Sequence, residues 1–211
     1  MISIEEFLTT IRKGEIPLVP PIGTSINGFN FDNDAWDSCY RARDECIKAG
    51  MWTIVYDDWI KELALWIGNR TCLEIIAGAG WIAKALSAHG IDIVATDDYS
   101  WEKGSHNNHN ILRKYQYSIE ELEASEAVEK YQDIDILICS WPYMDNEFTN
   151  ACKYWQGKPI VYIGEGESGC TADDEFFQGF EEDESAPEIQ LMCWPGLHDH
   201  IQIGTWEKGG D

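Results

Sequence analysis

The stretch CLEIIAGAGWIAKAL, from Cys72 to Leu86, decides the fold of this chain. Its apolar first half is typical of a buried strand, and its second half has the spacing of a helix. Between them, Gly78 and Gly80 lack a Cβ, so the backbone there can approach a ligand closely. A helix that begins near Trp81 directs its N-terminal N–H groups toward the same place. The stretch therefore predicts a strand, a glycine turn and a helix that together can bind a nucleotide-like ligand.

An acidic signal lies one strand further along the chain. The run IDIVATDD, at 91–98, predicts a strand whose tip carries Asp97. In folds of this kind, an acid at that tip accepts hydrogen bonds from ribose hydroxyls. The glycines and the acid together favour a nucleoside cofactor over a glycine loop without a ligand.

From position 70 onward, strand-type and helix-type segments alternate. Further strands are predicted at 71–77, 133–141 and 158–166, helices at 81–90 and 171–180, and a weaker strand and helix at 117–122 and 123–131. Such alternation implies a parallel sheet with helices on both faces. At the end, 188–194 and 200–206 flank the turn PGLHD and predict an antiparallel β-hairpin.

The first 69 residues have a different pattern. Helices are predicted at 1–14, at 35–50 with Asp34 as its cap, and at 56–69. The intervening segment 15–31 is rich in Pro, Gly and Asn and predicts a loop. Phe29, Phe31 and Trp36 in and beside it either pack on the flank of the sheet or belong to a lid that excludes water from the pocket. We interpret 1–69 as a helical and lid segment and 70–211 as a Rossmann-like domain, within one structural domain overall.

The charge of the chain limits its partners. The 211 residues carry 15 Lys and Arg against 38 Asp and Glu, a formal net charge of −23. This balance disfavours nucleic acid, because binding there depends on Lys and Arg that neutralise phosphates. Either a solvated acidic face or a salt-adapted source would account for the negative charge.

The cysteine pattern points to a reducing compartment. The seven cysteines form no CxxC pair and lie mostly in apolar runs, so we expect free core thiols. The N-terminus carries acids where a signal peptide is basic, and no apolar run approaches about 18 residues. We therefore expect a cytoplasmic protein without a membrane segment. His106, His109, His198 and His200 lack a suitably spaced third ligand, so no metal site is expected.

Two nucleoside cofactors are compatible with the glycine turn. The run GAGWIA matches the dinucleotide fingerprint G-x-G-x-x-A. However, Glu74 precedes the glycines, and E-I-I-A-G-A-G resembles motif I of class I S-adenosylmethionine-dependent methyltransferases, an acid followed by G-x-G-x-G. Ile76 stands at the first of those glycine positions.

The run DILICSWPYM, at 135–144, resembles motif IV of the same superfamily, in which a strand ends in a proline–aromatic element. Ser140, Trp141, Pro142 and Tyr143 occupy the places of the (Asn/Asp/Ser)-Pro-Pro-(Tyr/Phe) signature of amino-group methyltransferases, with Trp141 at the first proline. The C-terminal hairpin is a third shared feature, which dinucleotide dehydrogenases generally lack. The resemblance covers about 70–206.

The resemblance implies a doubly wound α/β fold with a mostly parallel seven-stranded sheet and S-adenosylmethionine at its carboxyl edge. It places Glu74 under the methionine portion, Asp97 at the ribose and Glu123 at the adenine. The implied catalytic residues are Ser140, Pro142 and Tyr143. The implied cofactor-binding residues are Tyr56, Glu74, Gly78, Gly80, Asp97, Asp98, Glu123, Ser140 and Trp141.

The resemblance leaves the methyl acceptor open between a small molecule and a protein, with an amino group among the candidate atoms. Trp141 in place of proline and the acidity both disfavour a nucleobase. Two other functions stay open: an NAD(P)-binding Rossmann oxidoreductase, and a non-catalytic acidic binding or decoy protein. An enzyme needs a concave pocket beside Pro142, whereas a decoy needs a contiguous acidic surface.

Overall fold

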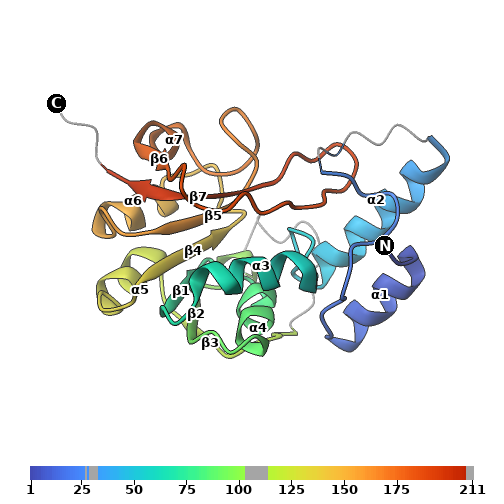
Figure 1. Cartoon of the computed structure of the whole chain (residues 1–211), viewed down its shortest axis with the longest axis horizontal. Coiled ribbons are helices and arrows are strands. Elements are labelled where there is room, and N and C mark those ends of the chain that lie inside the picture. Colours follow the sequence, from blue (N-terminus) through green and yellow to red (C-terminus); the bar gives the residue numbers. More distant parts are fainter. Residues whose placement is uncertain (27, 29–32, 103–113, 208–211) are drawn as a thin grey trace.

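The computed structural model describes residues 1–26, 28, 33–102 and 114–207, and of 33–35 and 102 only the backbone. Its centre is one seven-stranded sheet, surrounded by helices (Figure 1). The strands are β1 (Cys72–Ile75), β2 (Ile93–Asp97), β3 (Ile119–Glu121), β4 (Ile136–Ser140), β5 (Ile160–Gly164), β6 (Phe180–Glu182) and β7 (His200–Trp206).

The strand order is β3-β2-β1-β4-β5-β7-β6. The five strands from β3 to β5 are parallel, and β7 runs antiparallel to both of its neighbours, β5 and β6. The predicted fold class is therefore confirmed: the sheet is mostly parallel, has seven strands and ends in an antiparallel β6–β7 pair.

Seven α-helices and one short 3₁₀ helix lie in the described part of the chain. They are α1 (Ile4–Lys13), α2 (Asn33–Lys48), α3 (Asp57–Ile67), α4 (Trp81–Ala88), η1 (Ser100–Glu102), α5 (Ala124–Lys130), α6 (Glu147–Tyr154) and α7 (Asp174–Gly179). The expected helices are confirmed, although α2 begins at Asn33, so Asp34 lies in its first turn instead of capping it. The sequence did not predict α6.

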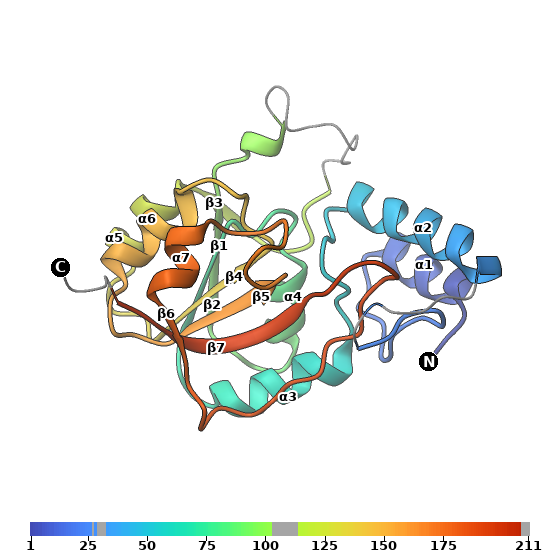
Figure 2. The ribbon, with the colours of Figure 1, turned by 90° about the horizontal axis from the view of Figure 1, so that it is seen from above.

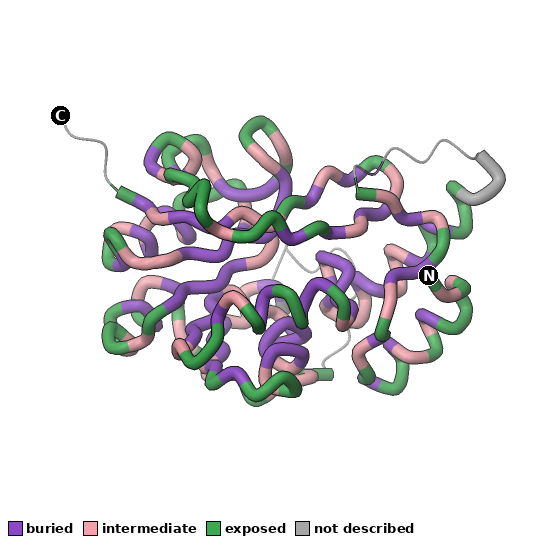
Figure 3. The backbone as a smooth tube through the Cα atoms, in the orientation of Figure 1, coloured by how far each residue is buried: buried purple, intermediate pink, exposed green. Residues whose placement is uncertain are grey.

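Helices cover the sheet on both faces. Figure 2 shows α5, α6 and α7 on one side of the sheet and α3 on the other. Along β4, Ile136 and Ile138 join one buried cluster, whereas Leu137 and Cys139 join the second. A strand buried on both faces explains the continuous apolar run of this segment. Figure 3 shows buried residues along the strands and exposed residues at the outer turns of the helices.

The predicted partner in the C-terminal hairpin was wrong. β7 pairs with β6, at Phe180–Glu182, and not with the segment 188–194. That segment alternates because Ile189, Leu191 and Cys193 are buried, but its only bridge to another segment in the described chain joins Cys193 to Ser25. The alternation thus reflects packing on one side of an extended segment and not membership of the sheet.

The N-terminal helices share the core of the sheet. α1 and α2 lie together at the end of the molecule that carries the N-terminus (Figures 1 and 2). One continuous buried cluster includes Phe7 of α1, Trp59 of α3, Ile138 of β4 and Trp194. All seven cysteines are free, and all but Cys170 are buried, as the sequence predicts. Within the described residues, no helix combines the length and apolar composition needed to span a bilayer.

Candidate active site

The centre of the sheet is the point at which the strand order reverses. β1 and β4 are neighbours, and the chain continues from β1 toward β2 on one side and from β4 toward β5 on the other. In open parallel sheets, ligands bind beyond the carboxyl ends of the strands at such a point. A cavity of about 150 Å³ lies there, and a smaller one of about 40 Å³ shares several of its lining residues: Gly50, Trp52, Ile76, Gly78 and Ser140.

The glycine turn presents Gly78 to both cavities. Gly78 has φ 55°, and a Cβ built on it would have only the Gly50 carbonyl oxygen nearby, at 3.9 Å. Its N–H donates to Asp97 Oδ2 at 2.7 Å, which fixes the turn against the tip of β2. The backbone at Gly78 is therefore open to a ligand, as the sequence predicts.

Gly80 lies at the other end of the glycine turn and packs against the start of β3. It precedes α4 with φ 76° and is not among the residues that line either cavity. A Cβ at this position would lie 2.9 Å from Tyr117 Cβ and 3.3 Å from Ile119 Cδ1. Gly80 therefore permits close packing of the turn against the start of β3. Its approach to a cofactor stays a prediction.

Three side-chain-bearing residues adopt the left-handed backbone conformation at the strand ends around the cavity. Ile76 follows β1 with φ 54°, Tyr99 lies two residues after β2 with φ 56°, and Trp141 follows β4 with φ 55°. Ile76 and Trp141 line the cavity directly. For a β-branched or bulky residue this conformation is uncommon, and such strain is concentrated at functional sites. Ile76 thus adopts a backbone conformation that glycine takes more readily.

The acids at the tip of β2 line the main cavity. Asp97 is buried, and besides Gly78 its carboxylate accepts the Tyr99 N–H at 2.8 Å and the Trp101 indole N–H at 2.9 Å. Burial raises the pKa of Asp97 to about 6, against the opposing effect of these hydrogen bonds. Asp98 beside it accepts the Ser100 N–H at 2.7 Å. Both acids are therefore anchored by backbone groups and lie where a ribose is expected.

Glu74 lies beneath the turn. Its side chain is buried, lines the smaller cavity, and accepts the Ala83 N–H of α4 at 2.9 Å. Burial, which outweighs that hydrogen bond, raises the pKa of Glu74 to about 8. This acid joins β1 to the first turn of α4, directly behind the glycine turn.

All four residues of the proline–aromatic element line the main cavity: Ser140, Trp141, Pro142 and Tyr143. The Trp141 indole stacks on Trp52, with ring centroids 5.6 Å apart and planes inclined by 24°. Its N–H donates to Asp199 Oδ2 at 3.1 Å, and the same oxygen accepts the Thr53 hydroxyl at 3.0 Å. Trp141 is therefore held by groups from two distant segments and forms one wall of the site.

Eight residues that line the main cavity were not predicted as site residues. They are Gly50, Trp52, Ile76, Ala79, Ser100, Trp101, Glu147 and Cys170. Glu147 begins α6, and burial together with the charges of Asp98 and Asp145 raises its pKa to about 7. The pattern that could have revealed it is the polar run DNE at 145–147, which is typical of a helix start directly after motif IV.

Tyr56 and Glu123 are not among the residues that line the cavities. The buried Tyr56 hydroxyl accepts the Met192 N–H at 3.2 Å and donates to the Gln190 carbonyl at 3.5 Å. It therefore anchors the segment 188–194, and its predicted contact with a cofactor stays a prediction. Glu123 is exposed and precedes α5. In the segment before the glycine turn, Trp52 is the aromatic residue that reaches the site.

The remaining predicted features lie elsewhere. His106, His109, Phe29 and Phe31 are outside the described residues. Trp36, the third aromatic of the expected lid, lines a different cavity. Within the described part of the chain, no group of three His, Cys, Asp or Glu residues is arranged to hold a metal ion.

No protein-family model and no curated protein matches this chain. Solved structures of low identity are similar to it. A TehB-like SAM-dependent methyltransferase from Corynebacterium glutamicum is 14% identical over 83% of this chain and 100% of its own, with a TM-score of 0.49. Magnesium protoporphyrin IX methyltransferase from Synechocystis, with bound SAM, is 9% identical over 85% and 93%, with a TM-score of 0.45. TehB from Haemophilus influenzae is 14% identical over 74% of this chain, which spans 63% of TehB, with a TM-score of 0.44. Similarities of such low identity and TM-score assign no activity to this chain. Any assignment has to rest on the order of its own strands and on the residues that line its cavities.

Proposed function

We propose that this protein is an S-adenosylmethionine-dependent methyltransferase. The observation that carries the proposal is the position of β7, which lies between β5 and β6 and runs antiparallel to both. In the same sheet, β1 contains Glu74 and is followed by the turn with Gly78 and Gly80. A dinucleotide-binding Rossmann sheet has the parallel order 3-2-1-4-5-6 instead. The order and direction of the strands therefore favour a methyltransferase over an NAD(P)-dependent oxidoreductase.

The residues at the sheet edge fit this cofactor. Gly78 leaves room for a ligand at the backbone, and Asp97 and Asp98 supply acceptors for ribose hydroxyls at the tip of β2. The stacked Trp52 and Trp141 rings form an aromatic wall, and aromatic faces attract cations such as a sulfonium. When bound, S-adenosylmethionine supplies a methyl group that its sulfonium already activates.

The chain's own contribution is to position the acceptor and to manage its proton. Tyr143 provides a ring against which a planar acceptor can pack, and the Ser140 hydroxyl can accept an N–H. Glu147 lies in the same cavity, and a carboxylate there can hold an ammonium group or take its proton. We infer an amino-group acceptor, carried by a small molecule or a protein. A net charge of −23 favours the approach of cationic acceptors and disfavours nucleic acid.

Calorimetric titration of the purified chain with S-adenosylhomocysteine and, separately, with NAD tests the cofactor. We expect S-adenosylhomocysteine to bind saturably and NAD not to bind. Gly78→Ala places a methyl group in the open space of the cavity and should weaken binding by about tenfold or more, equivalent to about 1.4 kcal/mol.

Gly90→Ala is the matched control for this substitution. Gly90 also has a positive φ, 83°, and has no atom within 4 Å of its built Cβ, but it lies in the turn after α4. The Gly90→Ala variant carries the same type of backbone strain away from the site. Its affinity for S-adenosylhomocysteine should therefore stay at the wild-type value. The proposal is contradicted if the chain binds NAD and not S-adenosylhomocysteine, or if Gly78→Ala and Gly90→Ala lose equal affinity for S-adenosylhomocysteine.

A further inference from the structure

Asp199 reaches the candidate active site because β7 runs antiparallel to β5. It directly precedes β7, whose first residue, His200, pairs with Gly164 at the end of β5. The parallel strands end at the edge of the sheet that carries the cavities, and an antiparallel strand begins at that same edge. The acid in the turn GLHDH is thereby placed next to the proline–aromatic element.

The Asp199 carboxylate fixes the orientation of the Trp141 side chain. Asp199 is 4% exposed, and its Oδ2 accepts both the Trp141 indole N–H at 3.1 Å and the Thr53 hydroxyl at 3.0 Å. The Trp141 backbone N–H donates to the Ile163 carbonyl of β5 at 2.8 Å. The sheet therefore holds the backbone of Trp141, whereas Asp199 holds its ring.

The ionisation of Asp199 strengthens this contact. Burial raises the pKa of Asp199 to about 6, against the opposing effect of the hydrogen bonds from Trp141 and Thr53. The charge of Glu165 adds to the rise, and that of Arg43 opposes it. Above this pH the group is a carboxylate, and a charged acceptor makes a stronger hydrogen bond than a neutral one.

The ring that Trp141 stacks on borders the junction of the two cavities at the sheet edge. Trp52 lines both cavities, whereas Asp97 and Asp98 line only the larger one and Glu74 only the smaller one. With the ribose at the two aspartates and the methionine portion at Glu74, the sulfonium between them falls at this junction. An aromatic face attracts a cation, and Trp does so more strongly than Tyr or Phe. A neutral thioether gains no such attraction.

We propose that Asp199 is a positioning residue that fixes the Trp141 ring on Trp52, so that the paired rings select the sulfonium of S-adenosylmethionine over the thioether of S-adenosylhomocysteine. This proposal rests on the methyltransferase function. Asp199 is not among the residues that line the two cavities, so it acts through Trp141. Such selection favours release of the product after each transfer.

Calorimetric titration of the full chain with each cofactor, at a pH well above the pKa of Asp199, tests the proposal. The readout is the Kd of S-adenosylhomocysteine divided by the Kd of S-adenosylmethionine. Asp199→Leu leaves the indole N–H without its acceptor. This ratio should fall by about threefold to tenfold, through weaker binding of S-adenosylmethionine, while the affinity for S-adenosylhomocysteine stays within about twofold of the wild type.

Asp199→Asn separates the position of the ring from the charge of the carboxylate. Within the described residues, Asp199 Oδ1 is buried without a hydrogen-bond partner. The amide NH₂ can therefore replace Oδ1, and the amide oxygen can accept both donors in place of Oδ2. This variant should keep the ratio within about twofold of the wild-type value.

Asp135→Leu is the matched control for the loss of hydrogen bonds. Asp135 Oδ2 also accepts two, from the Thr71 N–H at 2.8 Å and the Thr71 hydroxyl at 2.9 Å. It precedes β4, at the opposite edge of the sheet, so the ratio should be that of the wild type. Trp141→Phe keeps a ring and removes the donor, should lower the ratio like Asp199→Leu, and replaces that variant if circular dichroism shows that it does not fold. Combining the two should lower the ratio no further.

Three results overturn the proposal. The first is an equal loss of affinity for both cofactors in Asp199→Leu, which a purely structural role would cause. The second is an equal fall of the ratio in Asp199→Asn and Asp199→Leu, which would assign the selection to charge. The third is a ratio that Trp141→Phe does not change. Each of these leaves the methyltransferase proposal standing, whereas a wild type that binds neither cofactor contradicts that proposal and this one with it.

Discussion

At the scale of single residues, Glu147 is the side chain that most directly extends the site beyond its sequence motifs. It is an acid in a cavity lined by aromatic rings, and its pKa is raised to about 7. Its carboxylate also accepts the Ala124 N–H, so a glutamine can replace it without loss of that hydrogen bond. Its titration therefore falls in the range in which a general base operates.

Glu147→Gln should lower turnover of an amine acceptor by roughly 10²–10⁴-fold and leave S-adenosylhomocysteine affinity nearly unchanged. In the wild type, turnover should rise with pH through about 7, because the deprotonated carboxylate is the active form. That rise should disappear in the variant. The measurement is kcat/KM against pH, with the exposed Glu129→Gln of α5 as the control. An unchanged pH profile in Glu147→Gln would assign the titration to another group.

Glu74 connects a single ionisation to the stability of the fold. Its pKa of about 8 lies well above that of an exposed glutamate, so the folded chain holds a proton that the unfolded chain has released. The stabilisation is complete below the ordinary pKa of about 4.3 and is lost as pH rises through the folded value. Above that pH the folded chain carries a buried charge.

Glu74→Gln should therefore match the wild-type melting temperature near about pH 5 and exceed it increasingly toward about pH 9. Glutamine keeps the acceptor for the Ala83 N–H and removes the buried charge. Thermal unfolding followed by circular dichroism at several pH values measures the difference. The exposed Asp92→Asn should show no such trend. A constant difference at all pH values is inconsistent with the raised pKa.

At the scale of elements, the antiparallel end of the sheet depends on one glycine. Gly204 of β7 faces β6 so closely that a Cβ would lie 2.1 Å from the Glu181 carbonyl oxygen and 2.8 Å from the ring of Phe180. Because the obstacle is backbone, a rotamer change cannot relieve it. The pairing of β6 with β7 therefore requires glycine at this position.

Gly204→Ala should separate β6 from β7 and destabilise the fold by about 1–3 kcal/mol or more. Equilibrium unfolding in urea measures the loss, and hydrogen exchange at Glu181 and Glu182 shows whether the pairing is lost. Gly166→Ala, which has no atom within 4 Å of its built Cβ, is the control. Because β6 is the edge strand furthest from the switch point, S-adenosylhomocysteine affinity should be retained. Full protection of β6 in the variant would show that the sheet adjusts at no cost.

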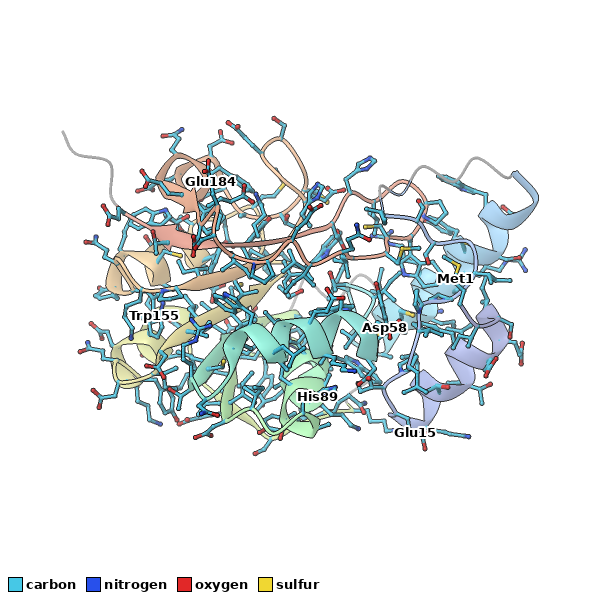
Figure 4. The ribbon with its side chains drawn as sticks, viewed as in Figure 1. Met1, Glu15, Asp58, His89, Trp155 and Glu184 are labelled. Carbon is cyan, nitrogen blue, oxygen red and sulfur yellow. The ribbon has the colours of Figure 1, made fainter. Side chains whose placement is uncertain are left out.

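At the scale of the whole molecule, exposed acids occur on separate parts of the chain. Figure 4 labels Glu15, Asp58 and Glu184, which lie on separate parts of the molecule. The few surface ion pairs, such as Lys48 with Asp44 at 2.6 Å, offset little of a net charge of −23, because exposed pairs contribute about 0–1 kcal/mol.

Salt should therefore stabilise this protein. The repulsion among like charges opposes the compact state, and the Debye length falls from about 10 Å at 0.1 M to about 3 Å at 1 M salt. We expect the melting temperature to rise by several degrees over this range, equally in NaCl and KCl. A fall in melting temperature with salt would show that attractive pairs dominate. A rise in only one of the two salts would indicate a specific ion site.

The sequence by itself determined the strands at the centre of the sheet and the turns that follow them. β1, β2, β4 and β5 are short apolar runs bounded by glycine or polar residues, and these signals are local in the chain. The sequence also predicted three motifs because each is encoded by neighbouring residues. They are the glycine turn, the acid at the tip of β2 and the proline–aromatic element. Parallel strands bring their carboxyl ends to one edge, so these motifs had to meet there.

Only the tertiary structure decided which side chains complete the site and which segment pairs with β7. Trp52 meets Trp141 through the packing of the N-terminal segment on the sheet, which no local pattern encodes. The three-residue β6 has too little sequence to show a period, whereas 188–194 alternates without a strand partner. Alternation records which side chains are buried, and burial against a helix leaves the same pattern as burial in a sheet. The partner is chosen by contacts between distant segments, which a single sequence does not display.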